Sequence, residues 1–186
     1  MNSIKQIEVI SSEALVGRLA LTKEGLCAFE YSAEWLKSGF SISPFELPLR
    51  SSVFIAKPQP FDGGFGVFDD CLPDGWGLLI LDRYLQRQGI NPRTLTLLDR
   101  LALVGSTGRG ALEFRPDKSV IAEQEYADFE KLALEAERIL DSDDYMGAGI
   151  EEFQHRGGSP GGARPKIFTR HEGKEWLVKF RAKQDP

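Results

Sequence analysis

Residues 75–88 carry apolar side chains around most of the circumference of a helix, and this feature constrains the fold most strongly. The apolar residues recur at helical spacing in two rows, Trp76, Leu79, Ile80 and Tyr84 in one and Leu78, Leu81 and Leu85 in the other. A helix with such a wide apolar surface must be covered on several sides. The segment is therefore predicted to be a central helix, around which other elements pack.

Shorter patterns before and after this helix predict both strands and helices. Strands are expected at 4–10, 14–21, 25–31 and 110–115, and a hairpin at 167–169 and 175–180. Further helices are expected at 33–37, capped by Ser32, after a cap at Thr94, and at 126–140. Residues 61–68 are too rich in glycine for a regular helix and are predicted to be a packed loop. The pattern predicts an α+β fold.

Composition excludes several classes of protein. The chain has 186 residues and a formal net charge of −5, which argues against a general nucleic-acid binder. Two cysteines, Cys27 and Cys71, and two histidines give no spacing for a structural zinc site or a disulfide framework. The N-terminus lacks a signal-peptide pattern, and no apolar run is long enough to span a membrane. A cytoplasmic location is expected.

Charge is distributed unevenly along the second half of the chain. Residues 117–152 contain 3 basic and 12 acidic side chains, whereas residues 153–186 contain 8 basic and 3 acidic ones. A change in organisation is therefore expected near residue 117, and an anion site after residue 153.

The glycine loop, residues 157–166, is the strongest candidate for that anion site. Glycines allow backbone N–H groups to approach an anion, and Lys166 at its exit with Lys179 on the next strand supplies positive charge. The loop matches neither the P-loop nor the dinucleotide-binding pattern. A flexible connecting loop without a ligand is the alternative.

Other polar residues have simpler explanations. Ser159 lies between Arg156 and Arg164, so a phosphoserine there would find arginine partners, although an ordinary loop serine explains it as well. Asp74 precedes the central helix and is predicted to be its N-cap. Asp69 and Asp70 do not have calcium-loop spacing, and no metal site is predicted. His155 and His171 are expected to lie at the surface.

Several motifs, in order along the chain, resemble HipA-family proteins, the bacterial serine/threonine kinase toxins. The sequence FDDCLPD at 68–74 is similar to the family signature F-x-N-L-L-P-D. YSAEWL at 31–36 and ELPL at 46–49 resemble the Y-x-x-x-W-L and S-L-P-L elements. Residues 103–105 and 108–112 resemble the end of the N-terminal subdomain. The resemblance implies a HipA-like N-terminal subdomain at 1–115 and the beginning of a kinase N-lobe at 116–186.

The resemblance also assigns roles within the glycine loop. Its second half corresponds to the ATP-binding loop of the family, which implies nucleotide contacts from Gly161, Gly162, Ala163, Arg164, Pro165 and Lys166. Lys179 corresponds to a strand lysine that contacts ATP, and Ser159 to an autophosphorylated serine. A complete kinase of this family uses ATP and Mg²⁺.

The family's catalytic motifs are absent from this sequence. Phosphoryl transfer needs a base and metal ligands, which the family supplies from a later helical lobe, and no similar motif occurs here. No catalytic residue is therefore assigned, and the chain is expected to be an N-terminal fragment that neither phosphorylates nor hydrolyses ATP alone and binds it weakly or not at all. Residues 145–165 are expected to be mobile.

The resemblance further implies partners. They are a helix-turn-helix antitoxin of HipB type, DNA through that antitoxin, and a protein substrate of the translation machinery, within a type II toxin–antitoxin system linked to persistence. The alternative is a stand-alone, non-catalytic module that docks on a separately encoded HipA-like kinase lobe and restrains it. An unrelated α+β domain is the third possibility.

Overall fold

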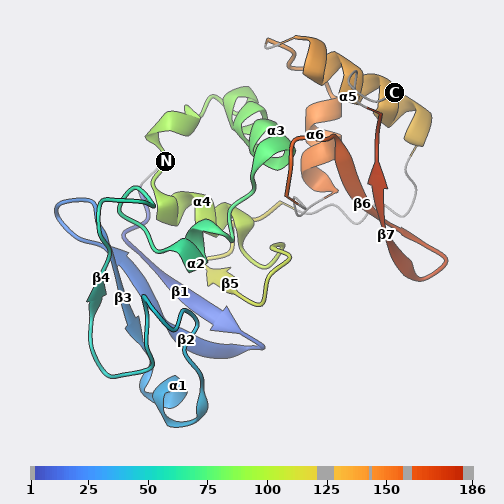
Figure 1. The fold of residues 1–186 in the computed structure, drawn as a ribbon. Helices are drawn as coiled ribbons and strands as arrows, with labels where there is room; N and C mark the ends of the chain where they lie inside the picture. The colour runs from blue at the N-terminus through green and yellow to red at the C-terminus, as the bar shows by residue number, and fades with distance from the viewer. Residues whose placement is uncertain (1–2, 121–127, 143, 157–160, 182–186) are drawn as a thin grey trace. The chain divides into compact units, whose positions relative to one another are not determined.

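A computed structural model describes residues 3–120, 128–142, 144–156 and 161–181 of the chain (Figure 1). These residues form two compact units. The first contains Met1–Leu72 and Leu95–Ser119, and the second contains Pro73–Thr94 and Val120–Pro186. The units are discontinuous in sequence, because the helix predicted to be central belongs to the second. The division into an N-terminal subdomain at 1–115 and the beginning of a kinase N-lobe at 116–186 stays a prediction.

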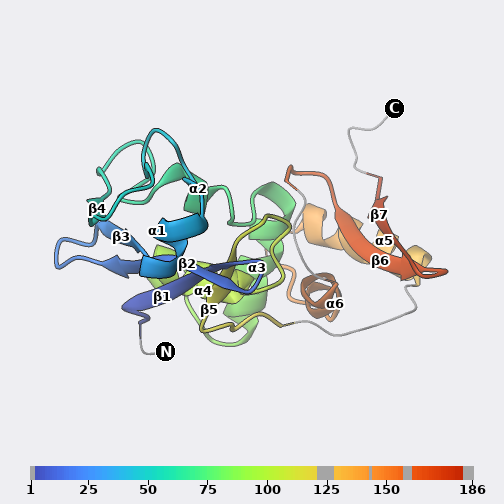
Figure 2. The same cartoon turned by 90° about the horizontal axis from the view of Figure 1, so that it is seen from below.

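An antiparallel sheet of five strands forms the first unit, in the order β4-β3-β2-β1-β5 (Figure 2). The strands are β1 (Gln6–Ser11), β2 (Ala14–Leu21), β3 (Cys27–Tyr31), β4 (Phe54–Ile55) and β5 (Glu113–Arg115). The two edge strands are only two and three residues long. Strands β1, β2, β3 and β5 confirm the strands predicted at 4–10, 14–21, 25–31 and 110–115. The mixture of a sheet with helices confirms the predicted α+β fold.

Three helices complete this unit: α1 (Ala33–Ser38), α2 (Gly66–Asp69) and α4 (Leu97–Val104). The Ser32 cap is confirmed, because its side chain accepts a hydrogen bond from the Trp35 N–H. The packed loop predicted at 61–68 was partly wrong, since residues from Gly66 onward form α2. The cap predicted at Thr94 was also wrong: Thr96 caps α4 and forms a capping box with Asp99, and Thr94 ends the short 3-10 helix Pro92–Thr94.

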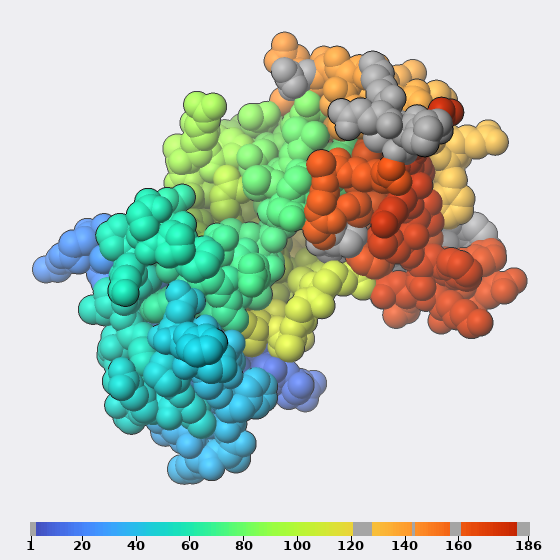
Figure 3. Space-filling view, in the orientation of Figure 1, coloured from blue at the N-terminus to red at the C-terminus, as the bar shows by residue number. Residues whose placement is uncertain are grey.

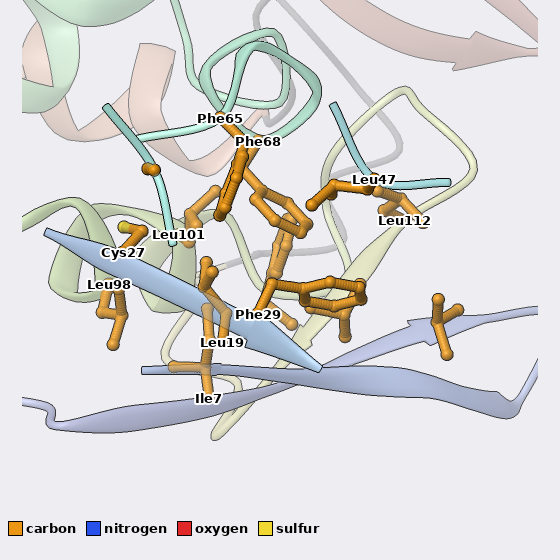
Figure 4. Close-up of a cluster of buried hydrophobic side chains, with 14 of the residues drawn as sticks. Ile7, Leu19, Cys27, Phe29, Leu47, Phe65, Phe68, Leu98, Leu101 and Leu112 are labelled. Carbon is orange, nitrogen blue, oxygen red and sulfur yellow. The ribbon is translucent and has the colours of Figure 1, made fainter. Parts of the chain in front are cut away.

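The core of the first unit lies between the sheet and helices α2 and α4 (Figure 4). Phe68 of α2 is fully buried, and its ring lies 5.5 Å from that of Phe29 and 6.4 Å from that of Phe114, measured between centroids. Leu98 and Leu101 of α4 close the same cluster. Phe68 therefore joins the short helix α2 to two strands of the sheet.

The surface of this unit also carries apolar side chains. Residues 40–55, light blue to teal in Figure 3, include Phe40, Phe45, Val53 and Ile55, and the Phe45 side chain is fully exposed. Phe45 thus provides a natural comparison for a buried phenylalanine.

Helices and one hairpin form the second unit. They are α3 (Gly75–Arg87), α5 (Phe129–Asp141), α6 (Gly149–His155), β6 (Lys166–His171) and β7 (Lys174–Lys179). Trp76 and Ile80 of α3 lie in a buried cluster with side chains from α5, α6 and the hairpin. The predicted hairpin is confirmed, and so is the helix predicted at 126–140 from residue 129 onward; residues 126 and 127 lie outside the described residues.

Helix α6 was not predicted. Residues 145–165 were expected to be mobile, but 149–155 form a helix whose Ile150 and Phe153 are buried. The Phe153 ring contacts Trp76 at 5.0 Å and Phe180 at 5.8 Å between centroids. This part of the expectation was wrong, because tertiary packing stabilises a helix too short to be stable alone. No helix among the described residues has the length and apolar character needed to cross a membrane.

Phe68→Ala is predicted to destabilise the protein by about 3–5 kcal/mol, because it removes a buried ring from the contacts with Phe29 and Phe114. The free energy of unfolding from urea denaturation measures the effect. Phe45→Ala is the matched control and should change stability by less than about 0.5 kcal/mol. Equal losses for the two variants would contradict the described core.

Asp99→Asn is predicted to destabilise the protein by about 1–3 kcal/mol at neutral pH. Burial alone would raise the pKa of Asp99, but hydrogen bonds from the Ile4 N–H, the Thr96 side chain and the Thr96 N–H outweigh it and lower that pKa below its ordinary value of 3.8. The ionised carboxylate thus contributes its full stabilisation above the ordinary pKa of 3.8. This contribution disappears as the pH falls through the lower pKa that Asp99 has in the folded protein.

Urea denaturation between pH 2 and pH 7 tests this dependence on Asp99. The difference between wild type and Asp99→Asn should shrink on acidification. Asp69→Asn, at an exposed aspartate, makes the same change in net charge and is the control. A difference independent of pH would refute the assigned role of the carboxylate.

Candidate functional site

The described part of the glycine loop, residues 161–166, enters strand β6. Gly161 to Arg164 are exposed, whereas Pro165 and Lys166 are buried. Lys179 ends strand β7 and is exposed. The structure therefore brings together the predicted site residues from 161 to 166 and Lys179. Ser159, the predicted phosphoacceptor, lies outside the described residues.

Lys166 and Lys179 are directly opposite each other in the antiparallel register of β6 and β7. Directly paired residues project from the same face of a hairpin, and two like charges in that arrangement are unfavourable. The Phe180 N–H continues the pairing by donating to the Pro165 carbonyl over 2.8 Å. The hairpin thus holds two lysines together at the exit of the loop.

The surroundings of Lys166 disfavour its charged form. Burial lowers the pKa of its ammonium group most, the positive charges of Lys179 and Arg164 lower it further, and the Asp74 carboxylate partly opposes them. Its Nζ donates to the Gly161 carbonyl over 2.7 Å and to the Gly162 carbonyl over 3.3 Å. An anion beside this group would favour its charged form.

Asp74 has a different role from the predicted one. It precedes α3 at the N-cap position, but its side chain makes no capping hydrogen bond. Its Oδ1 instead accepts a hydrogen bond of 2.9 Å from the Gly162 N–H, 88 residues away in the sequence. The predicted N-cap position is therefore confirmed, but the capping hydrogen bond is absent, because a tertiary contact takes the oxygen that a local cap would have used.

Two further contacts join residue 162 to the start of α3. The Trp76 N–H donates to the Gly162 carbonyl over 3.1 Å. A Cβ atom on Gly75 would lie 2.6 Å from the Gly162 carbonyl carbon, so only glycine permits this approach. Gly162 itself has a φ of +102°, which also favours glycine. The described part of the glycine loop is thus held against the first turn of α3 at Gly162.

This arrangement is suited to binding an anion. Exposed backbone with two glycines lies beside the positively charged residues Lys166, Lys179 and Arg164. Phosphate groups are ligands that lysine and backbone N–H groups bind well. The residues of this site are therefore chemically suited to binding a phosphate group.

The other predicted polar residues do not join this site. His171 is exposed, and His155 is half-buried with its ring 6.4 Å from that of Tyr84. Burial raises the pKa of the Cys27 thiol to about 11, so it is protonated at neutral pH and a poor nucleophile. Across the ranges that the structure describes, no three His, Cys, Asp or Glu side chains gather to hold a metal.

The contact of Asp74 and the opposition of the two lysines could not be predicted from sequence spacing. Asp74 stands immediately before a helix, where a cap is the usual role, and nothing local indicates a partner in the glycine loop. The register of the hairpin decides whether Lys166 faces Lys179, and the turn at Glu172 and Gly173 is the only sequence signal for that register.

Comparison with known proteins identifies the family. Residues 7–115 match the family model described as the HipA N-terminal domain. This match covers more than half of the chain, which therefore belongs to the HipA N-terminal domain family. No curated protein matches the chain.

The fold is also similar to that of a solved protein. It matches a chain of the complex described as the Shewanella oneidensis MR-1 toxin–antitoxin system of HipA, HipB and its operator DNA, with a TM-score of 0.54 and 21% sequence identity. The match covers 92% of this chain and 37% of that chain. The likeness confirms the fold, and this chain spans little more than a third of the length of that protein.

Gly75→Ala is predicted to destabilise the second unit by about 1–3 kcal/mol more than Gly89→Ala. Both glycines have positive φ, +44° and +72°, but a Cβ on Gly75 would meet the backbone of Gly162 while a Cβ on Gly89 would meet nothing within 4 Å. Gly89→Ala therefore measures the backbone strain alone. Urea denaturation followed by tryptophan fluorescence gives both values, and equal losses would contradict the contact between the glycine loop and α3.

Proposed function

We propose that this chain is the N-terminal part of a HipA-like serine/threonine kinase of a type II toxin–antitoxin system, and that its glycine loop binds the phosphates of ATP. The observation that supports the proposal most is the direct pairing of Lys166 with Lys179 at the exit of the loop. Two cations held face to face are stabilised by a polyanion between them. Membership of the HipA N-terminal domain family supports the same proposal.

The residues present fit a triphosphate. Lys166 and Lys179 supply charge, and residues 161–164 supply exposed backbone next to it. Pro165 has no N–H, so it contributes no backbone donor. ATP, with Mg²⁺, would supply the phosphoryl group for transfer, and the residues of this chain would bind and orient its phosphates. The catalytic base and the metal ligands would come from a further lobe.

The proposal extends to regulation and partners. Ser159 would be the autophosphorylation site, and its phosphate would compete for the basic residues near the loop and turn the kinase off. The partners would be a HipB-type antitoxin, DNA through it, and a protein substrate of the translation machinery. The solved complex of HipA, HipB and operator DNA supports the antitoxin part of this proposal.

An NMR titration of the whole chain with ATP tests the nucleotide site. ATP at millimolar concentration should shift the backbone amide signals of residues 161–164 and 166, because these residues would contact its phosphates. Lys166→Ala and Lys179→Ala should each weaken binding roughly tenfold, the value of one hydrogen bond to a charged group.

Lys174→Ala is the control for this titration. Lys174 lies on the same strand β7 and is exposed, but it pairs with His171 at the other end of the hairpin. It should leave the affinity for ATP unchanged. The proposal is refuted if ATP shifts no amide in residues 161–166, or if the three lysine variants weaken binding equally.

A further inference from the structure

The carboxylate of Asp74 occupies a backbone N–H group, that of Gly162, which is a suitable donor to an anion. Its Oδ1 accepts from the Gly162 N–H over 2.9 Å. The other oxygen, Oδ2, lies 3.2 Å from the position of a Cβ on Gly161. Asp74 is exposed, so neither packing nor burial alone holds it in this position.

The charge of Asp74 acts on the same lysine that would bind phosphate. The negative charge at Asp74 favours the charged form of Lys166, against the effects of Lys179 and Arg164. Asp74 thus performs, within the free protein, two tasks of a bound anion: it accepts a loop N–H and it stabilises Lys166 as a cation.

The N-terminus of α3 reinforces this arrangement. The Trp76 N–H donates to the Gly162 carbonyl, and the missing Cβ of Gly75 lets the two backbones meet. Gly162 therefore donates its N–H to Asp74 and accepts, through its carbonyl, from the Trp76 N–H of α3. A phosphate that uses the Gly162 N–H must displace the carboxylate.

We infer that Asp74 is an internal anion that competes with phosphate for the Gly162 N–H, and so limits the affinity of residues 161–166 for nucleotide. The inference rests on the proposed ATP site and adds to it a residue that sets affinity. The negative carboxylate of Asp74 repels a negatively charged phosphate group placed beside it. A neutral side chain at this position removes both the repulsion and the competition for the Gly162 N–H.

Two variants remove the charge while keeping an oxygen that can accept a hydrogen bond. Asp74→Asn preserves the shape of the side chain, and Asp74→Ser provides a shorter neutral side chain. Each should bind ATP roughly tenfold more tightly than wild type, as expected for removal of one like charge near the ligand. Asp144→Asn, at an exposed aspartate in the same unit, makes the same change in net charge and should alter affinity less than twofold.

The ligand-free proteins provide a second measurement. Hydrogen exchange of the Gly162 amide, followed by NMR, should be faster in Asp74→Asn and Asp74→Ser than in wild type, because the charged acceptor is lost. Asp144→Asn should leave it unchanged. Unchanged exchange in both Asp74 variants would overturn the inference.

The titrations separate failure of this inference from failure of the proposed function. If ATP binds in a manner sensitive to Lys166→Ala, but the Asp74 variants bind it with equal or lower affinity, the proposed function stands and the inference is wrong. If no protein, wild type or variant, binds ATP at residues 161–166, both are wrong. Tighter binding by both Asp74 variants together with faster Gly162 exchange supports both.

Discussion

The hydrogen bond from the Gly162 N–H to the Asp74 carboxylate is the interaction on which the candidate site depends. It joins residues 88 positions apart and fixes the glycine loop against the first turn of α3. The contact of Trp76 with the Gly162 carbonyl and the lack of a side chain at Gly75 make this approach possible.

The hairpin adds a second constraint, which is electrostatic. Its register places Lys166 opposite Lys179, and burial of Lys166 makes its charge costly. Asp74 and the carbonyls of Gly161 and Gly162 are among the groups that compensate this charge. Under the proposed function, a bound phosphate would replace contacts that the chain makes with itself.

Local signals allowed much of the fold to be predicted. Alternating and apolar runs identified β1, β2 and β3, and the hydroxyl of Ser32 identified the start of α1, because these features depend on neighbours in sequence. The prediction failed where distant contacts decide the structure. Helix α6, for example, is stabilised by Trp76 and Phe180. The start of α4 was missed for a local reason, because the capping box of Thr96 and Asp99 lies two residues beyond the predicted cap.

The site was predicted in part for the same reason. The glycines, Lys166 and Lys179 could be named from residue type and resemblance, because glycine loops with lysines are recognisable in sequence. The partner of Gly162 could not be, since Asp74 appears in sequence as an ordinary residue before a helix. The match to the HipA N-terminal domain covers most of the first unit and the α3 segment of the second, whereas the glycine loop and the hairpin lie beyond it.

The Asp74 carboxylate holds Gly162 against the first turn of α3. A scalar coupling transmitted through the hydrogen bond, between the Gly162 amide nitrogen and the Asp74 carboxyl carbon, tests it most directly by NMR. The structure predicts a measurable coupling, together with a nuclear Overhauser effect between the Gly75 and Gly162 α-protons. Absence of both signals in the folded, ligand-free protein would contradict it.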